Sequence, residues 1–223
     1  MTRVSVIVPV FNGAATLLDA IESIRAQNVS TEIIVVDDGS TDDTPRILET
    51  LDDVIAIRQD NTGPAAARNR GLLAATAPFI AFLDDDDVWL PQKLERQLQL
   101  FVEHPEAALV LGRTAFHALD SRTGDWLPFD EPRHLYHLGA ALCRRELFDQ
   151  IGMLDPALPS SEDVDWFLRV RDAGHTILSM PDVVQIHRRD GTNMTRGKDL
   201  RELGFLEVVK RSLDRRRAGR PQP

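Results

Sequence analysis

Short apolar runs alternate with amphipathic segments through the first half of the chain, and this alternation limits the possible folds more than any other feature. The apolar runs are of strand length and rich in β-branched residues, as in strands buried on both faces. They lie at Val4–Val10, Glu32–Val36, Val54–Arg58, Phe79–Leu83 and Ala107–Leu111. Helical spacing of apolar residues marks the segments between them, at residues 17–27, 41–51, 63–75 and 91–102. The pattern predicts an α/β protein with a Rossmann-like, mostly parallel sheet and helices on both faces.

The second half of the chain is less regular. Residues 112–138 have weak periodicity and predict short strands and loops. Further helices are predicted at Arg145–Ile151, Ser161–Arg171 and Asp199–Leu213, and two short strands at His175–Met180 and Val183–His187. We expect two halves of one domain, residues 1–111 and 112–197, followed by a C-terminal helix and basic tail at 198–223.

Polar side chains follow the predicted strands at the points where the strands end. Asn12, the pair Asp37 and Asp38, and the run Asp84–Asp87 all occupy such positions. Because open parallel sheets bind ligands beyond the carboxyl ends of their strands, we expect these residues to line one cleft.

The run Asp84–Asp87 places four adjacent carboxylates after a buried strand. Mutual repulsion makes this costly unless a cation compensates, and Mg2+ or Mn2+ prefers carboxylate and phosphate oxygens. The favoured prediction is therefore a divalent-metal site, with a solvated acidic turn as the alternative. Asp37 and Asp38 precede Gly39 and have two interpretations as well, a contact to a base or ribose and an ordinary tight turn.

Three further sets of residues are candidates for the same cleft. In the small-residue helix 63–71, Arg68 or Arg70 could pair with a phosphate or with the acidic run. Glu162, Asp163 and Asp165 open a helix, where they either complement its dipole or supply a general base. His187 ends the last short strand and is either structural or part of a metal site.

Composition excludes several classes of protein and partner. The only cysteine, Cys143, rules out an internal disulfide and a cysteine-built zinc site. A net charge of -9 argues against nucleic acid as a partner. No apolar stretch approaches the ~20 residues that span a bilayer, and we expect a cytoplasmic protein. The basic end of the chain, with Arg215–Arg217, predicts either a solvated helix end or a peripheral contact with the inner face of the membrane.

Taken in order, these motifs resemble those of the family 2 glycosyltransferases, which have the GT-A fold. The resemblance covers roughly residues 4–193. It rests on Val-Ser-Val-Ile-Val-Pro-Val-Phe-Asn, Val-Val-Asp-Asp-Gly-Ser-Thr-Asp, Gly-Pro-Ala-Ala-Ala-Arg-Asn-Arg-Gly, Phe-Leu-Asp-Asp-Asp-Asp and Ser-Glu-Asp-Val-Asp-Trp. Phe11 departs from the family pattern, which often has Tyr there, so ring stacking is kept and a hydroxyl contact is lost.

The resemblance implies a role for each matching position. Asp163 corresponds to the catalytic base, and Asp84, Asp86 and His187 correspond to metal-binding positions, with Asp86 as the direct ligand. The implied nucleotide-binding residues are Pro9, Phe11, Asn12, Asp37, Asp38, Arg68, Asp84 and Asp85.

By the same resemblance, the chain would be an inverting enzyme of cell-surface polysaccharide biosynthesis, assisted by Mn2+ or Mg2+. It would move a hexosyl or N-acetylhexosaminyl group from a nucleoside-diphosphate sugar, with UDP favoured, to a saccharide or lipid-linked acceptor. The segment 112–197 would be the acceptor-binding half.

Two other functions fit parts of the sequence. One is a catalytically idle, nucleotide-binding partner subunit, because the chain after His187 is short. The other is a haloacid-dehalogenase-like phosphatase with Asp84 as nucleophile, although that motif normally follows the first strand and here follows the fourth.

Overall fold

The computed structural model describes residues 3–158, 160–190, 199 and 202–218. The strands are β1 (Val4–Val10), β2 (Thr31–Asp37), β3 (Val54–Arg58), β4 (Phe79–Phe82), β5 (Val88–Trp89), β6 (Ala107–Leu119), β7 (Trp126–Arg133), β8 (Ala141–Arg144) and β9 (Thr176–Arg189). The helices are α1 (Leu17–Arg25), α2 (Thr44–Leu48), α3 (Pro64–Ala74), α4 (Lys93–Glu103), the short 3-10 helix η1 (Leu138–Ala140), α5 (Glu146–Ile151), α6 (Glu162–Asp172) and α7 (Phe205–Ala218).

Within these residues the strands form one nine-stranded sheet in the order β3-β2-β1-β4-β8-β6-β9-β5, with β7 paired to β6. Strands β1 to β4 are parallel. Strand β8 is antiparallel to both β4 and β6, so β6 and its parallel partner β9 run in the same direction as β1. Because Val10 is paired with Asp37 and Ile7 with Phe82, the loops after β1, β2 and β4 meet at one edge of the sheet, as predicted.

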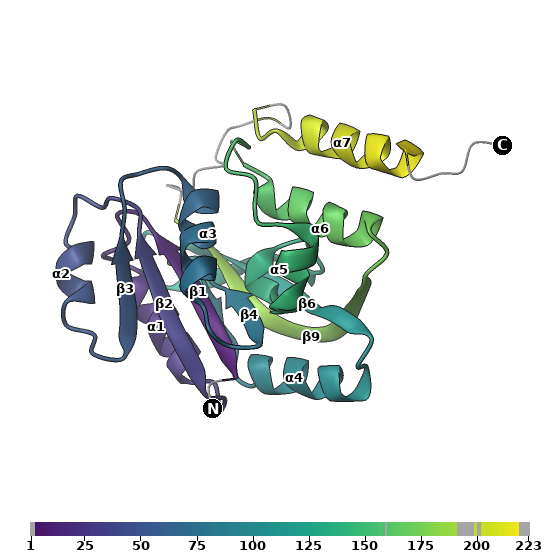
Figure 1. The fold of residues 1–223 in the computed structure, drawn as a ribbon. Coiled ribbons are helices and arrows are strands. Elements are labelled where there is room, and N and C mark those ends of the chain that lie inside the picture. The colour runs from purple at the N-terminus through teal and green to yellow at the C-terminus, as the bar shows by residue number, and fades with distance from the viewer. Residues whose placement is uncertain (1–2, 159, 191–198, 200–201, 219–223) are drawn as a thin grey trace.

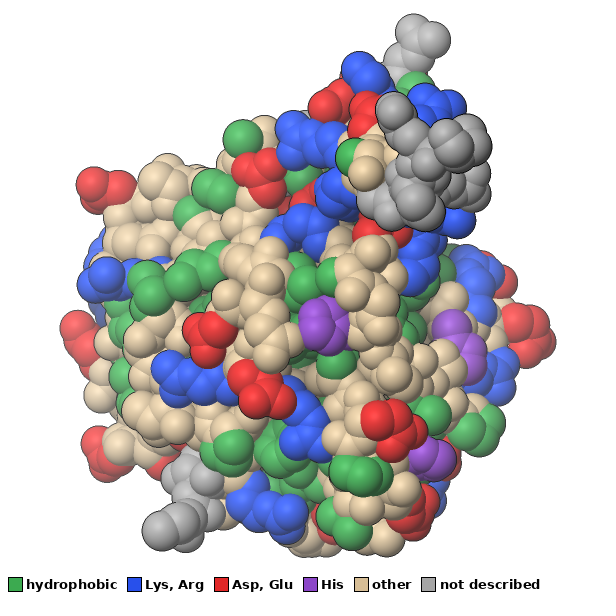
Figure 2. Space-filling model, turned by 45° about the vertical axis from the view of Figure 1, so that its right-hand side comes forward, with side chains coloured by type: hydrophobic (Ala, Val, Ile, Leu, Met, Phe, Trp, Pro, Cys, Tyr) green, Lys and Arg blue, Asp and Glu red, His purple; other side chains and the backbone are tan. Residues whose placement is uncertain are grey.

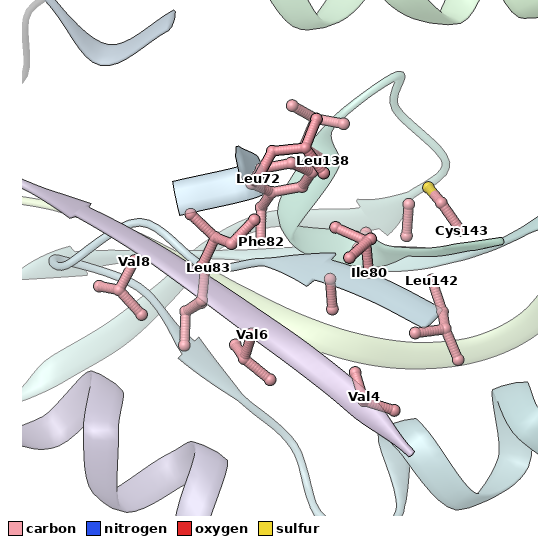
Figure 3. Packing of buried hydrophobic residues seen from close by; sticks show 14 of the residues in the cluster. Val4, Val6, Val8, Leu72, Ile80, Phe82, Leu83, Leu138, Leu142 and Cys143 are labelled. Atoms are coloured by element: carbon pink, nitrogen blue, oxygen red, sulfur yellow. The ribbon is translucent and has the colours of Figure 1, made fainter. Parts of the chain in front are cut away.

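Helices cover both faces of the sheet, as the alternating pattern predicted. Helices α1 and α4 lie on one face, whereas α3, α5 and α6 lie on the other (Figures 1 and 3). Every residue of β1 is buried. Helix α3 can approach this strand closely because Gly71 has no side chain, and a Cβ there would lie 2.4 Å from Cγ2 of Ile7.

The C-terminal half is more regular than its sequence suggests. Residues 112–138 do not form only short strands and loops, because β6 continues to Leu119 and pairs with β7. The two strands predicted over 175–187 are one strand, β9, which pairs with β6 across register shifts. One of these shifts, between the Leu111–Ser179 and Arg113–Val183 pairs, accommodates Pro181 within the strand.

Three predicted helix starts are wrong. Helix α2 begins at Thr44, because Ser40 and Thr41 bond to Asn12 instead of capping a helix. Helix α4 begins at Lys93 because Gln92, just after Pro91, is left-handed with φ 64°. The last helix begins at Phe205, beyond Gly204 with φ 73°, whereas it was predicted from Asp199. Residues 200–201 of the predicted span lie outside the described part of the chain.

Helix α7 packs on α6 and on the segment before it. Val208 of α7 packs with Leu158 and Leu168. Arg215 binds Asp172 of α6 at 3.3 Å, and Arg211 binds Asp155, which precedes α6, at 2.8 Å. In Figure 1, α7 lies at the top of the molecule, and Figure 2 shows many blue Lys and Arg side chains in that upper part. Among the described residues, no helix has the length and apolar character needed to cross a membrane.

Candidate active site

The acidic run forms a tight turn between β4 and β5. The amide of Asp87 donates to the carbonyl of Asp84 at 3.1 Å, which closes the turn. Asp84 lies beside Arg68 of α3, and Asp87 lies beside His187 of β9. Asp85 approaches the loop after β1, where a Cβ at Gly13 would collide with its carboxylate. The turn therefore brings α3, β9 and the end of β1 to one place.

Arg68 is a buried cation held between two acids. Its Nη2 donates to Asp84 at 2.5 Å, and its Nη1 donates to Glu162 of α6 at 2.6 Å. Burial raises the pKa of Asp84, and the Arg68 charge more than reverses this effect, so that the pKa lies at about 2. Both terminal nitrogens of Arg68 therefore join the acidic turn to the start of α6.

Asp87 is fully buried and acts as an acceptor for several groups. Nδ1 of His187 lies 3.1 Å from each of its carboxylate oxygens, and the amide of Arg188 donates to it at 2.9 Å. Gln185 donates its side-chain amide to the same carboxylate. Burial lowers the pKa of His187, but the hydrogen bond and the charge of Asp87 outweigh it, so the pKa is raised.

A second histidine lies beside this group. His137 precedes η1, and its Nε2 lies 3.7 Å from Asp84. Its Nδ1 lies 3.2 Å from Oε1 of Gln185. Potential ligand atoms of Asp87, His137 and His187 all lie within 4.8 Å of one another, close enough for one metal ion.

Asp85 and Asp86 have raised pKa values. Burial is the main cause for both, and the neighbouring carboxylates add to it. The pKa of Asp85 reaches about 7, and that of Asp86 about 8. A divalent cation nearby would stabilise the ionised forms and reverse these shifts, so this donor set suits such an ion.

The three carboxylates that open α6 have different surroundings. Glu162 pairs with Arg68, and Asp165 pairs with Arg169 at 2.8 Å. Asp163 forms no ion pair with any described residue and accepts a bond from the amide of Val164 at 2.7 Å. Burial raises the pKa of Asp163 to about 6.

Asp37 and Asp38 organise the loops after β2 and β3. Asp37 accepts from the amide of Ser40 at 2.8 Å and pairs with Arg58. Asp38 accepts from the side chain of Gln59 at 2.8 Å and from the backbone of residues 62 and 63 at 2.9 and 2.8 Å. Each carboxylate oxygen can accept two bonds, so these contacts leave Asp38 with acceptor capacity for a ligand.

The remaining predicted nucleotide-binding residues lie at the end of β1. The Phe11 side chain is 49% exposed, so its ring can be reached by a base. Asn12 has φ 56° and accepts the amide of Thr41 at 2.8 Å, which links the loops after β1 and β2. Pro9 is buried inside β1, two residues before Phe11.

The sequence argument did not single out His137, Gln185 or Glu162 for the roles their contacts suggest. His137 lies 48 residues from Gln185, and Asp87 lies 100 residues from His187. No local motif joins them, because the pairing of β5 and β6 with β9 brings them together.

The sequence is similar to those of several known proteins. Residues 5–154 match the model of glycosyl transferase family 2. The putative teichuronic acid biosynthesis glycosyltransferase TuaG of Bacillus subtilis is 29% identical over 214 residues, which cover 87% of this chain and 82% of TuaG. The chain spans only 18, 20 and 54% of the length of the first three curated relatives it matches.

Two solved structures have the same fold. S. aureus TarS 1-349 in complex with UDP-GlcNAc superimposes with a TM-score of 0.79 and 22% identity, over 96% of this chain and 66% of that one. The mannosyltransferase PcManGT of Pyrobaculum calidifontis, in complex with GDP-Man and Mn2+, gives a TM-score of 0.72 and 22% identity, over 99% of this chain and 66% of that one.

Proposed function

Because the chain belongs to glycosyl transferase family 2, we propose that it transfers a sugar from a nucleoside-diphosphate sugar to a hydroxyl group of a saccharide or lipid-linked acceptor. Its GT-A fold confirms the fold predicted from the motifs. The observation that carries the proposal is the position of Asp163. This half-buried carboxyl group, free of ion pairs among the described residues, opens α6 beside the Arg68–Glu162 pair, which also holds Asp84 of the acidic turn.

Asp163 is the proposed general base. A raised pKa makes its carboxylate a stronger base, and Arg68 holds the start of α6 through Glu162. Asp163 accepts the proton of the acceptor hydroxyl while that oxygen forms a bond to the anomeric carbon. The bond from this carbon to the diphosphate breaks on the opposite face, its electron pair leaves with the nucleoside diphosphate, and the configuration is inverted.

The donor nucleotide is proposed to lie across the loops after β1 and β2. Phe11 offers an exposed ring for stacking on the base, and Asp38 retains acceptor capacity for the base or ribose. The complexes of TarS with UDP-GlcNAc and of PcManGT with GDP-Man support a hexose or N-acetylhexosamine donor. We favour UDP as the nucleotide.

Mn2+ or Mg2+ is proposed to bind at the acidic turn through Asp86, Asp84 and His187. The burial and mutual repulsion of these carboxylates fit such an ion, and the Mn2+ of PcManGT supports it. When bound, the cation would supply positive charge to neutralise the departing diphosphate.

The place of action is proposed to be the inner face of the membrane, in cell-surface polysaccharide synthesis. TuaG, by its name a teichuronic acid biosynthesis enzyme, supports this setting. Arg216 and Arg217 are exposed on α7, where they can approach acidic lipid, although Arg217 also lies 3.8 Å from Asp214. Arg211 and Arg215 are less exposed and bind acidic side chains of the protein.

The test compares Asp163→Asn with the parent chain. UDP, GDP and dTDP, each with and without Mn2+, are first ranked by thermal shift, because the true ligand stabilises by mass action. Release of nucleoside diphosphate and formation of product are then followed with the matching sugar donors. We expect Asp163→Asn to bind nucleotide like the parent and to transfer at least ~100-fold more slowly.

Asp165→Asn is the matched control, because it removes a carboxylate from the same helical turn and leaves the Arg68–Glu162 pair in place, so it should transfer at a near-parental rate. A near-parental rate for Asp163→Asn would refute the assignment of the base. If the parent bound nucleotide but transferred no sugar, the chain would instead be the idle partner subunit.

A further inference from the structure

Gln185 connects the two histidines of the site through a buried side chain. It lies on β9, is fully buried, and its amide group spans the space between Asp87 and His137. Its Nε2 donates to the Asp87 carboxylate, while its Oε1 lies 3.2 Å from Nδ1 of His137. A buried amide whose nitrogen and oxygen both form hydrogen bonds has one favourable orientation.

Hydrogen-bond chemistry then determines the state of the His137 ring. An amide nitrogen can only donate, so Nε2 is the end of Gln185 that faces the carboxylate. The amide oxygen can only accept, so Nδ1 of His137 must carry the hydrogen in this contact. In the neutral ring, the lone pair is therefore left on Nε2, the nitrogen that lies 3.7 Å from Asp84.

His187 is held in the same way by Asp87 itself. Its Nδ1 lies 3.1 Å from both carboxylate oxygens, which can only accept from it. The hydrogen is again on Nδ1, and the lone pair is on Nε2. Asp87 thus orients one ring directly and the other through Gln185, and its oxygens already accept from three donors of the protein, Gln185, His187 and the amide of Arg188.

Hydrogen bonds and close packing fix the segment that carries His137. A Cβ at Gly139 would lie 2.6 Å from Nε2 of Gln185, so this glycine allows the amide to pack against the chain. The indole of Trp89 donates to the carbonyl of Gly139 at 2.8 Å, and Gln97 donates to that of Ala140 at 3.0 Å. These contacts leave little freedom for the backbone beside the histidine.

We propose that His137 is a further ligand of the divalent cation and that Gln185 is the positioning residue that presents its Nε2. The inference rests on the proposed function, which supplies the cation. In this arrangement Asp87 does not bind the cation, although its oxygens lie within 4.8 Å of ligand atoms of both histidines. Its oxygens instead accept the hydrogen bonds that orient the two imidazoles. Metal-binding histidines commonly donate their second ring nitrogen to such a partner.

The first test measures the tautomer of His137 without metal. The full chain is labelled with 15N in histidine, and the ring nitrogens are observed by NMR in alkaline buffer, where the imidazoles are neutral. The His137→Asn spectrum identifies the signals of this ring among the six histidines. We expect hydrogen on Nδ1 in the parent and a shift toward the other tautomer in Gln185→Met.

The second test measures Mn2+ binding in the presence of UDP or of whichever nucleotide the thermal-shift panel selects. Electron paramagnetic resonance of free Mn2+ gives the affinity. Loss of an orienting partner typically lowers metal affinity by about 10–100-fold, and we expect this for Gln185→Met and for His137→Asn. In the His137→Asn background, Gln185→Met should change the affinity by about twofold or less, because the two residues act as one unit.

Gln27→Met is the matched control. It removes a buried amide that bonds to Ser23, Leu90 and Leu94 and contacts neither the histidines, Asp87 nor the segment that carries His137, so it should lower stability and leave Mn2+ affinity unchanged. The inference is overturned by hydrogen on Nε2 of His137 in the parent, or by an unchanged affinity in Gln185→Met. Sugar transfer that requires no divalent cation would leave the proposed reaction standing and refute the ligand role of His137.

Discussion

Arg68→Met tests whether the buried ion pairs around Arg68 hold the two halves of the site together. Methionine keeps an unbranched side chain and removes the charge. In the parent, Arg68 is 8% exposed and bonds to Asp84 at 2.5 Å and to Glu162 at 2.6 Å. The substitution leaves both acids in place without their cation.

The expected loss is large because both acids are shielded from water. The side chain of Asp84 is 25% exposed and that of Glu162 is 10% exposed. Removing one partner of a buried ion pair costs about 3–5 kcal/mol, a large share of the ~5–15 kcal/mol that stabilises a typical domain. With an urea m-value of about 2–3 kcal/mol/M, the unfolding midpoint should fall by about 1–2 M.

The loss should depend on pH in a defined direction. In the parent, the pKa of Asp84 lies at about 2, below its ordinary 3.8, so ionised Asp84 contributes stability above pH 3.8 that disappears as the pH falls through 2. Without Arg68, burial dominates and raises that pKa above 3.8, so ionised Asp84 destabilises the fold. Acidification relieves this cost, and the difference in unfolding free energy between variant and parent should therefore narrow from pH 8 to pH 4.

The assay is urea unfolding of the metal-free chain at both pH values, followed by tryptophan fluorescence and circular dichroism. Arg46→Met is the control, because the Arg46–Asp43 pair is exposed and should contribute under ~1 kcal/mol. If Arg68→Met does not fold, Glu162→Gln provides a milder disruption of the same cluster. A loss below ~1 kcal/mol at pH 8, or a difference that widens on acidification, would refute the argument.

Four other predictions concern catalysis, nucleotide binding and packing. Below the Asp163 pKa of about 6, the transfer rate at saturating substrates should fall about tenfold per pH unit as the base is protonated, and a flat profile from pH 8 to 5 would contradict this. Phe11→Ala should weaken nucleotide binding by about 1–3 kcal/mol in calorimetry with little change in Tm, since the ring is exposed. Asp38→Ala should weaken nucleotide affinity and also lower Tm, because it leaves buried donors without an acceptor, at about 1–3 kcal/mol. Gly71→Ala should cost about 1–3 kcal/mol in urea unfolding, because its Cβ would collide with Ile7.

The parallel half of the fold could be predicted from sequence because its signals are local. Strand β1 is a continuous apolar run between polar residues, and the residues of α1 have a clear helical period. The meeting of Asp37, Asp38 and Asp84 then follows from topology, because parallel strands carry their carboxyl ends to the same edge.

The antiparallel half could not be predicted because its strands are defined by their partners. Strand β5 has only two residues, Val88 and Trp89, and exists through its pairing with β9. Strand β7 is largely exposed and has no apolar alternation, so its pairing with β6 leaves no hydrophobic pattern in the sequence. The His137–Gln185–Asp87 contacts depend on these pairings and were hidden for the same reason.

The acidic residues at the start of α6 could either stabilise the helix end or supply a general base. Their contacts distinguish these two roles, which the residue types alone do not. Helix-dipole stabilisation accounts for acids in a first turn, but it does not account for the left-handed Ser161 before them, with φ 62°. Such a conformation is unfavourable for serine and needs support, which comes from the bond of its hydroxyl to the carbonyl of Leu203 at 3.0 Å. Ser161 forms no side-chain cap, so it does not serve to begin the helix in the usual way. Glu162 is tied to Arg68, so the next carboxylate, Asp163, is the acid of this turn that is half-buried and free of ion pairs among the described residues. Its pKa is raised by desolvation to about 6, a property that suits a general base and that a capping acid would not need.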